Sequence, residues 1–150
     1  MAVDTISLTF NGYWRSEAIG GIPNESGVYV VYDGVPDSST NTVSLRQVLY
    51  IGESERVRDR IRDHERWPEW RKNLGLGGGL YFSFAPISVA TRNRAEAALI
   101  YERKPPLNIE YTNEFPFDAT TVKLAGEVYL LKTYFVLYRT SKSTVTDSRD

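Results

Sequence analysis

Short apolar runs separated by turn-forming residues dominate the first half of the chain, and this pattern predicts β-strands. Residues 6–10 alternate apolar and polar side chains, as a strand with one buried face does. Residues 28–32 and 48–51 are rich in β-branched and aromatic side chains, which favour strands. Residues 33–41 between them carry the glycine, proline, aspartate and serine typical of turns. We therefore expect an antiparallel hairpin with a long surface loop, and a further strand at residues 80–84.

Two helices are predicted on either side of that last strand. The first begins at Ser54, a favourable N-cap residue, and ends near residue 65, because Trp67-Pro68-Glu69-Trp70 breaks it. The second spans residues 92–103, with Thr91 as its expected N-cap. It stops before a pair of prolines, since proline disfavours helix in the residue that precedes it.

Polar side chains share the apolar stripes of both predicted helices. Arg60 and His64 fall at helical spacing beside Val57 and Ile61, and Glu96 shares a face with apolar residues of the second helix. Polar groups at such positions need partners when they are buried. Arg60, His64 and Glu96 are therefore candidates for a functional site.

The C-terminal part of the chain is patterned less clearly. Residues 127–139 are apolar or aromatic at odd and even positions, which indicates one or two strands and leaves a buried helix as the alternative. Residues 141–150 predict a disordered tail. The elements together predict an α+β fold, with a small central antiparallel sheet of about three core strands flanked by helices and a β-rich C-terminal extension. We expect one domain over residues 1–140, with its motif core at 22–108 and the extension at 109–140.

The composition excludes several classes of protein. The 150 residues suffice for one domain with a proper core. The chain has no cysteine, so disulfides, zinc ribbons and thiol nucleophiles are excluded, which fits an intracellular protein. No apolar run is long enough to cross a bilayer, and the N-terminal residues do not resemble a signal peptide. We therefore expect a cytoplasmic protein without membrane contact.

The net charge of −1 differs from that of a strong nonspecific DNA binder, which is usually basic. Positive charge is nevertheless concentrated in two segments, residues 55–72 and residues 92–104. These are also the segments that carry Arg60, His64 and Glu96. The distribution predicts a local basic face and a modest affinity for nucleic acid that falls as the salt concentration rises.

Several short motifs follow one another in a specific order. Six positions stand out: Tyr29 in Gly-Val-Tyr, Tyr50 in Tyr-Ile-Gly, Arg60, His64, Glu96 in Glu-Ala-Ala-Leu-Ile, and Asn108 in Lys-Pro-Pro-Leu-Asn. In this order and spacing they resemble the motifs of the GIY-YIG nuclease superfamily. That superfamily includes the catalytic domain of a bacterial excision-repair nuclease, intron homing endonucleases and some restriction enzymes. The resemblance covers residues 22–108.

The resemblance implies a metal-dependent endonuclease that hydrolyses DNA phosphodiester bonds with one divalent ion, Mg²⁺ or alternatively Mn²⁺. Glu96 would be the metal ligand, since one carboxylate with waters and a substrate phosphate is a usual way to hold Mg²⁺. Arg60 would grip the attacked phosphate with its planar guanidinium. Asn108 would fix, by hydrogen bonding, the geometry of the end of the site that holds the metal.

The two tyrosines and the histidine would serve the attacking water and the phosphate. Tyr29 would either accept the proton of the water or hold the water for attack, and acting as a base requires a nearby cation. Tyr50 would position the phosphate or share the role of base. His64 could supply the charge that stabilises a phenolate.

Two departures from the family leave an alternative function open. Tyr50 follows Tyr29 by 21 residues, a wider gap than the family usually has, which predicts an enlarged hairpin loop. Glu53 stands where some members have lysine, and an acid facing the site would repel phosphate. The alternative is a catalytically inactive or weakly active nucleic-acid-binding or interaction protein on the same fold.

Basic residues near the motifs are candidate contacts to nucleic acid: Arg56, Arg66, Arg71, Lys72, Arg92 and Arg94. Trp67 and Trp70 would either stack on bases or pack in the core. DNA is the expected partner, and the resemblance leaves open a phage, mobile-element, restriction or repair setting. Specificity would fall to loops 33–47 and 66–79, the extension, a partner protein or a homodimer.

Overall fold

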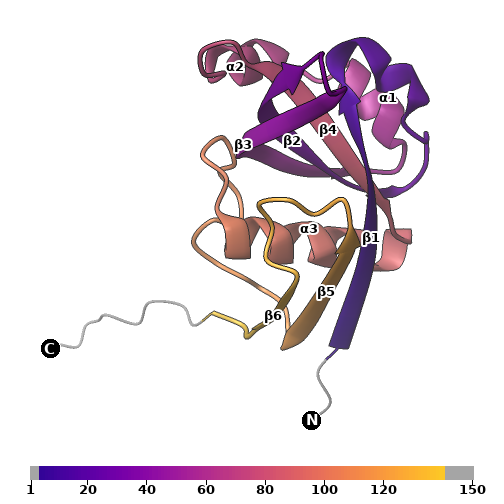
Figure 1. Cartoon of the computed structure of the whole chain (residues 1–150). Helices are drawn as coiled ribbons and strands as arrows, with labels where there is room; N and C mark the ends of the chain where they lie inside the picture. The colour runs from indigo at the N-terminus through magenta and orange to yellow at the C-terminus, as the bar shows by residue number, and fades with distance from the viewer. Residues whose placement is uncertain (1–3, 141–150) are drawn as a thin grey trace, which may run out of the picture.

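The computed structural model describes residues 4–140 and contains a six-stranded, strongly curled sheet (Figure 1). In sheet order the strands are β3 (Thr42–Ser54), β2 (Gly27–Asp37), β4 (Gly79–Pro86), β1 (Asp4–Arg15), β5 (Thr120–Gly126) and β6 (Tyr134–Leu137). Neighbouring strands are antiparallel except β1 and β5, which are parallel. The prediction of a small antiparallel sheet of three core strands flanked by helices is therefore wrong, because the sheet is larger and mixed and the helices are few.

Strand β1 accounts for the larger sheet, because it belongs to both of its halves. Residues 11–15 pair with β4, and residues 4–10 pair with β5 (Figure 1). The predicted strand at residues 6–10 is the central part of β1. Its alternating pattern indicates one buried face, but it carries no information about a parallel partner from the far end of the chain.

The predicted hairpin of β2 and β3 is confirmed, but its long loop is not. Pairing continues as far as Asp37 opposite Thr42, so residues 38–41 form the connection. Strand β4 pairs with β2 only as far as Gly34, so Pro36 lies in a two-stranded end where a missing N–H donor is tolerated. The wide gap between Tyr29 and Tyr50 thus lengthens the hairpin and not its loop.

The curled sheet has a hydrophobic core on each face. Helix α3 (Val89–Arg103) packs in the concave face, where its apolar residues meet Val28 and Val30 of β2. Helices α1 (Val57–Arg62) and α2 (Trp67–Lys72) cover the other face, together with the short 3-10 helix η1 (Ser16–Gly21). There they meet Tyr29 and Val31, so successive residues of β2 serve opposite cores.

The helix boundaries differ from the predicted ones. Helix α1 is shorter than predicted, and Ser54 lies before it, where its hydroxyl accepts a hydrogen bond from the Arg56 N–H. The Trp67–Trp70 segment begins α2 instead of only breaking α1, because proline is well accommodated in the first turn of a helix. Helix α3 begins at Val89 with Ser88 at its N-cap, so Thr91 lies inside it. Within residues 4–140, no helix is long and apolar enough to cross a membrane.

The C-terminal extension completes the concave core. Its main strand, β5, precedes residues 127–139, and β6 is the one strand within that range. Tyr32 Oη donates to the Tyr129 carbonyl at 2.9 Å, which ties the extension to β2. The predicted tail at residues 141–150 lies outside the described residues.

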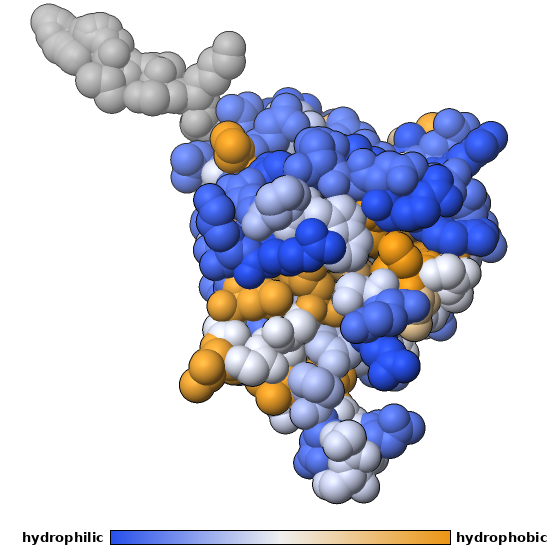
Figure 2. Space-filling view, turned by 90° about the horizontal axis from the view of Figure 1, so that it is seen from above, coloured by the Kyte–Doolittle hydropathy of each residue, from blue (hydrophilic) through white to orange (hydrophobic). Residues whose placement is uncertain are grey.

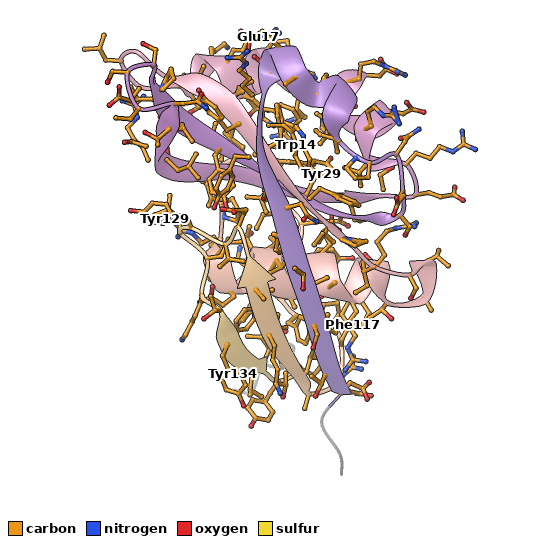
Figure 3. The ribbon with its side chains drawn as sticks, turned by 45° about the vertical axis from the view of Figure 1, so that its right-hand side comes forward. Trp14, Glu17, Tyr29, Phe117, Tyr129 and Tyr134 are labelled. Atoms are coloured by element: carbon orange, nitrogen blue, oxygen red, sulfur yellow. The ribbon has the colours of Figure 1, made fainter. Side chains whose placement is uncertain are left out.

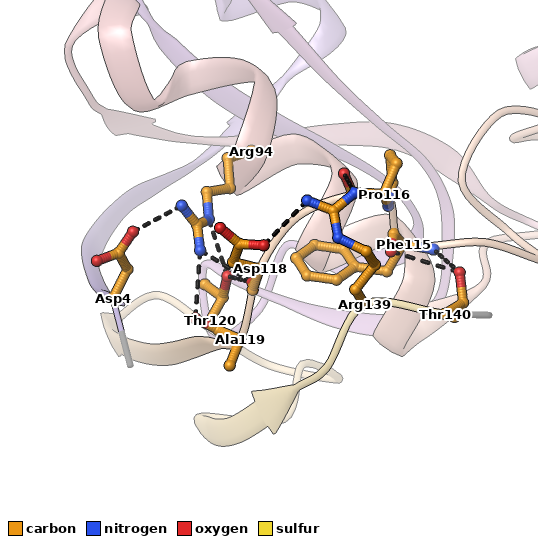
Figure 4. Close-up of polar contacts among 9 residues, drawn as sticks. All are labelled: Asp4, Arg94, Phe115, Pro116, Asp118, Ala119, Thr120, Arg139 and Thr140. Carbon is orange, nitrogen blue, oxygen red and sulfur yellow. Dashed lines mark hydrogen bonds and ion pairs between the residues drawn. The ribbon is translucent and has the colours of Figure 1, made fainter. Parts of the chain in front are cut away.

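Arg94 of α3 joins the starts of β1 and β5 (Figure 4). Its guanidinium donates to the Asp4 carboxylate at 2.7 Å, to Thr120 Oγ1 at 2.8 Å, and to the backbone carbonyls of Asp118 and Ala119. These contacts lie at the strand ends, where Asp4 and Thr120 are paired in the parallel ladder. Arg94 therefore fastens α3 to the half of the curled sheet that β1 forms with β5.

We predict that Phe115→Ala destabilises the protein by roughly 3–5 kcal/mol, the usual cost of truncating a buried phenylalanine. Phe115 is completely buried in the core beside α3 and belongs to the extension. Urea unfolding measures the loss. Phe117→Ala is the matched control, because Phe117 is only partly buried, and it should cost clearly less. Equal, small losses would mean that the extension is not part of the core.

Candidate active site

Tyr29 is held inside the molecule by a close contact with Gly52. Tyr29 is 1% exposed and lies in the interior beside the sheet (Figure 3). It pairs with Gly52 across β2 and β3. A Cβ atom on Gly52 would lie 2.3 Å from Tyr29 Oη, so only glycine leaves room for the hydroxyl. The space that Tyr29 needs therefore explains why the third residue of the Tyr-Ile-Gly motif is glycine.

Tyr50 faces the same side of the hairpin as Tyr29. It lies two residues before Gly52, the partner of Tyr29, and the register between them is unbroken. Val31 pairs with Tyr50 and Tyr32 pairs with Val48, which leaves Leu49 as the extra residue of a β-bulge in β3. The bulge adds Leu49 to the core beside α1 and α2, which Tyr50 also contacts. The Tyr29 and Tyr50 ring centroids lie 6.4 Å apart.

Asn108 joins the end of α3 to the free edge of β3. Its Oδ1 accepts from the Ile51 N–H at 2.9 Å, and its Nδ2 donates to the Ile51 carbonyl at 2.9 Å. Next to it, the Leu107 N–H donates to the Leu49 carbonyl at 3.2 Å. The Asn108 amide therefore imitates a neighbouring strand and holds the Tyr-Ile-Gly motif in place.

His64 lies at the centre of an aromatic cluster. Its side chain is 0% exposed, and its ring centroid lies 4.5 Å from that of Trp70 and 5.4 Å from that of Tyr50. Its Nδ1 accepts the Arg66 N–H at 3.0 Å, so the neutral ring carries its proton on Nε2. Burial, reinforced by the neighbouring Arg60, lowers the pKa of His64 to about 4. His64 is therefore uncharged at neutral pH and supplies no positive charge to a phenolate.

Arg60 leaves α1 toward Glu65, a residue that the sequence analysis missed. Arg60 Nη1 and Nη2 donate to the two carboxylate oxygens of Glu65 at 2.8 Å and 3.1 Å. These hydrogen bonds raise the pKa of Arg60 and lower the pKa of Glu65 to about 2. An acid five residues after an arginine is common on protein surfaces, so the sequence carries no distinctive signal for Glu65.

Glu96 is partly buried on α3, on the concave side of the sheet. Burial raises the pKa of Glu96 to about 8, and the negative charges of Glu53 and Glu110 act in the same direction. Glu53 pairs with Arg92, which also donates to Ser26 Oγ at 2.9 Å. Glu53 lies opposite Val28, whose side chain faces α3, so the acid that departs from the family pattern points away from the Tyr29 side.

Arg60 and Glu96 both lie within electrostatic reach of the two candidate tyrosines. Burial raises the pKa of Tyr29 well above its usual value and also raises the pKa of Tyr50. In both cases Arg60 opposes the rise and Glu96 adds to it. Strands β2 and β3, helix α1 and helix α3 therefore bring Tyr29, Tyr50, Arg60 and Glu96 to one region, with His64 and Asn108 packed around it.

The residues of this region fit a divalent ion that is also bound by substrate. Within residues 4–140, no three or more His, Cys, Asp or Glu side chains are grouped so as to hold a metal on their own. Mg²⁺ does not need such a group, because it usually keeps several waters and takes one or two carboxylates plus substrate phosphates. Glu96 can supply one carboxylate, and its desolvated position among like charges favours a bound cation.

The basic residues predicted to contact nucleic acid differ in whether their side chains already have a partner within the protein. Arg92 and Arg94 are engaged in the ion pairs described above, and Arg66 pairs with Glu69 and donates to the Leu107 carbonyl at 2.6 Å. Arg71 lies over the ring of Trp67, 4.8 Å from its centroid. Arg56 and Lys72 are exposed and form no ion pair with the described residues. Hydrophilic side chains cover most of the face that carries α1 and α2 (Figure 2).

The two tryptophans have different environments. Trp70 is completely buried beside His64, so it packs in the core. Trp67 is partly exposed, and its Nε1 donates to the Ile61 carbonyl at 2.5 Å. A base-stacking platform made from both rings is therefore excluded in this arrangement, and Trp67 alone remains at the surface.

A shallow hollow of about 330 Å³ lies beside α1, and Arg60 is the one motif residue in its wall. Three carboxylates, Glu55, Asp59 and Asp63, also line this hollow, so its charge disfavours a phosphate. A larger hollow of about 650 Å³ lies at the far end of the β2–β3 hairpin. None of the six motif residues lines the larger hollow.

Compared with known protein families, curated proteins and solved structures, the chain matches none of them. The case for its function therefore rests on the order of its motifs and on the geometry that brings them together.

We predict that His64 stays neutral, with the proton on Nε2, from about pH 5.5 to about pH 8, because burial disfavours the imidazolium. The chain has one histidine, so its ring signals in a ¹H–¹⁵N correlation spectrum need no further assignment. A pKa of about 4 is expected. A titration midpoint near the usual value of 6.5 would show that the ring is accessible and able to carry charge.

We predict that Glu96→Gln stabilises the metal-free protein, and more so at high pH. The folded state raises the pKa of Glu96 from 4.5 to about 8, so folding retains a proton that the unfolded chain releases in this window. Wild-type stability is therefore fully present below about pH 4.5 and is lost as the pH rises through about 8. Glutamine has no charge to lose, so we expect a gain of roughly 4–5 kcal/mol at about pH 9.

Urea unfolding at several pH values measures this difference. Glu102→Gln on the same helix is the matched control and should show no comparable pH dependence. A Glu96→Gln effect that is constant with pH would mean that Glu96 ionises as freely in the folded protein as in the unfolded chain.

Proposed function

We propose that the protein is a metal-dependent endonuclease that hydrolyses DNA phosphodiester bonds. The observation that carries this proposal is the packing of Tyr29 against Tyr50 and His64, with ring centroids 6.4 Å and 6.3 Å apart, on the side of the hairpin that α1 covers. Arg60 of α1 and Glu96 of α3 act electrostatically on both tyrosines. Phosphodiester hydrolysis needs an attacking water, neutralisation of developing charge, and a geometry that holds both. This set of side chains contains a group suited to each need.

Arg60 binds the attacked phosphate. A guanidinium presents several N–H donors in one plane, and phosphate oxygens accept them in pairs. Arg60 also lies within electrostatic reach of both tyrosines, so a phosphate bound there is close to the Tyr29 and Tyr50 hydroxyls. Arg60 therefore orients the phosphate relative to the water that attacks it.

Glu96 holds the divalent ion, Mg²⁺ or alternatively Mn²⁺, which supplies a Lewis acid for the phosphate oxygens. In the metal-free protein the raised pKa keeps Glu96 protonated at neutral pH. A cation beside it favours the carboxylate, so the proton of Glu96 leaves when the ion arrives. Binding of the ion at Glu96 therefore releases one proton from the protein.

Tyr29 orients the attacking water through its hydroxyl. Its raised pKa makes the protonated phenol the stable form. In this form Tyr29 Oη can donate a hydrogen bond to the water or accept one from it. Positive charge nearby lowers that pKa, and Arg60 is the protein group that acts in this direction. Tyr29 can then accept the water proton, while Tyr50 contacts the phosphate from the partly exposed side.

His64 and Asn108 are positioning residues in this proposal. His64 packs against Tyr50 and Trp70, and its Nδ1 caps the Arg66 N–H. Asn108, which follows α3, binds the backbone N–H and carbonyl of Ile51, the residue directly after Tyr50. Neither needs to change its protonation during the reaction.

DNA affinity of the isolated chain should be modest, since several predicted contacts are engaged in ion pairs. Arg56, Arg60 and Lys72 are the cations best placed to meet backbone phosphates near the site. Sequence recognition would come from a partner protein or from a second copy of the chain, which would also allow both strands of a duplex to be cut. We expect the protein to act in a cytoplasmic setting.

We predict metal-dependent nicking of supercoiled plasmid or of a single-stranded circle in Mg²⁺ or Mn²⁺, abolished by EDTA. Glu96→Ala and Arg60→Ala should each lower the rate by about a hundredfold to a thousandfold, as loss of one charge-stabilising group does. Glu102→Ala on the same helix is the matched control and should cut like the wild type. Equal cutting by Glu96→Ala would place the activity elsewhere, and no cutting by the wild type would favour a non-catalytic nucleic-acid-binding protein.

A further inference from the structure

Glu65 and Arg60 form a two-point ion pair at the edge of the candidate site. Each terminal nitrogen of Arg60 donates to a different oxygen of Glu65, at 2.8 Å and 3.1 Å. The side chains are 39% and 66% exposed. An exposed pair of this kind contributes less than about 1 kcal/mol to folding, so stability is a weak reason for its geometry.

The backbone that carries Glu65 is held on both sides. His64 Nδ1 accepts the Arg66 N–H at 3.0 Å, and Trp67 Nε1 donates to the Ile61 carbonyl at 2.5 Å. The contacts tie the turn between α1 and α2 to the buried ring of His64 and to the partly exposed ring of Trp67. Glu65 therefore projects from a fixed turn, and its carboxylate offers Arg60 a fixed anchor.

The ion pair keeps Arg60 close to the reacting groups. While bound to Glu65, the guanidinium still lowers the pKa of both Tyr29 and Tyr50. Glu65 uses Nη1 and Nη2, and it leaves the Nε–H of Arg60 and the outer N–H bonds without a described partner. These remaining N–H groups can donate to phosphate oxygens.

We propose that Glu65 is a positioning residue that fixes the guanidinium of Arg60 for a DNA phosphate. This inference rests on the proposed nuclease function. An arginine side chain has many rotamers, and holding it in place before substrate arrives reduces the ordering required on binding. Misplacement of a charged group by about an ångström can cost on the order of a hundredfold in rate. Glu65 would therefore act on turnover through Arg60.

The test compares Glu65→Gln with Asp63→Asn in metal-dependent cleavage. Asp63 is an exposed carboxylate two residues away that pairs with Arg62, so its removal reports the loss of a nearby negative charge alone. We expect Glu65→Gln to lower kcat by about tenfold to a hundredfold with KM changed less than about threefold. Asp63→Asn should keep kcat within about twofold of the wild type. In an Arg60→Ala background, Glu65→Gln should cause no further loss of kcat.

A second measurement does not depend on catalysis. The ¹⁵N resonances of the Arg60 guanidinium should show restricted rotation in the wild type and in Asp63→Asn, and free rotation in Glu65→Gln. A phosphorothioate dinucleotide with Mg²⁺ should shift these resonances while Glu65 is present. Thermal unfolding of the two variants should stay close to that of the wild type.

The outcomes separate this inference from the proposed function. A wild type that cuts, together with equal kcat for Glu65→Gln and Asp63→Asn, would overturn the positioning role. An increase of kcat in Glu65→Gln would also overturn it, because Glu65 would then compete with phosphate for Arg60. A wild type that never cuts refutes the nuclease proposal. Freely rotating Arg60 in the wild type refutes the positioning role independently.

Discussion

The contact between the Tyr29 hydroxyl and the bare Cα of Gly52 is the constraint on which the candidate site depends. It requires β2 and β3 to pair in one register, since a shift by one residue would turn Tyr29 to the opposite face. The same register places Tyr50 on the face of Tyr29, and Asn108 holds Ile51, between Tyr50 and Gly52, by two hydrogen bonds. The curled sheet brings α1 and α3 to this strand from opposite sides, and they add Arg60 and Glu96.

Charge in this region is arranged so that a cation is favoured. Glu96 is desolvated and lies near Glu53 and Glu110, and its charge also disfavours ionisation of the two tyrosines. Arg92 neutralises Glu53 on the concave side, and Arg60 is engaged by Glu65. A divalent ion would relieve the repulsion at Glu96 and would ease ionisation of Tyr29. The acidic overall charge of the chain is therefore compatible with a metal-dependent reaction at this one position.

The sequence predicted the hairpin of β2 and β3, because strand composition is a local pattern, whereas the shared role of the six motif residues came from a resemblance and stays a prediction. Residues 28–32 and 48–51 have unmistakable strand composition, and glycine and asparagine at motif positions have specific backbone tasks. The same reasoning failed for the parallel pairing of β1 with β5, which are far apart in the sequence. Apolar and polar residues alternate in any strand with one buried face, so the alternation does not identify the partner strand. Turn-forming residues at 33–37 were misread, because a two-stranded end tolerates proline and glycine. Glu65 was missed since nothing in its spacing distinguishes it from a surface acid.

The most direct test of the account is a crystal structure with Mn²⁺ and a phosphorothioate oligonucleotide, in which anomalous scattering locates the metal. The account predicts one ion about 2.1 Å from a Glu96 carboxylate oxygen, the usual range for a hard divalent ion. It also predicts a phosphate oxygen shared between that ion and the Arg60 guanidinium, with Tyr29 Oη close to the phosphorus. A metal bound elsewhere, or an oligonucleotide that leaves Arg60 and Tyr29 without contact, would contradict it.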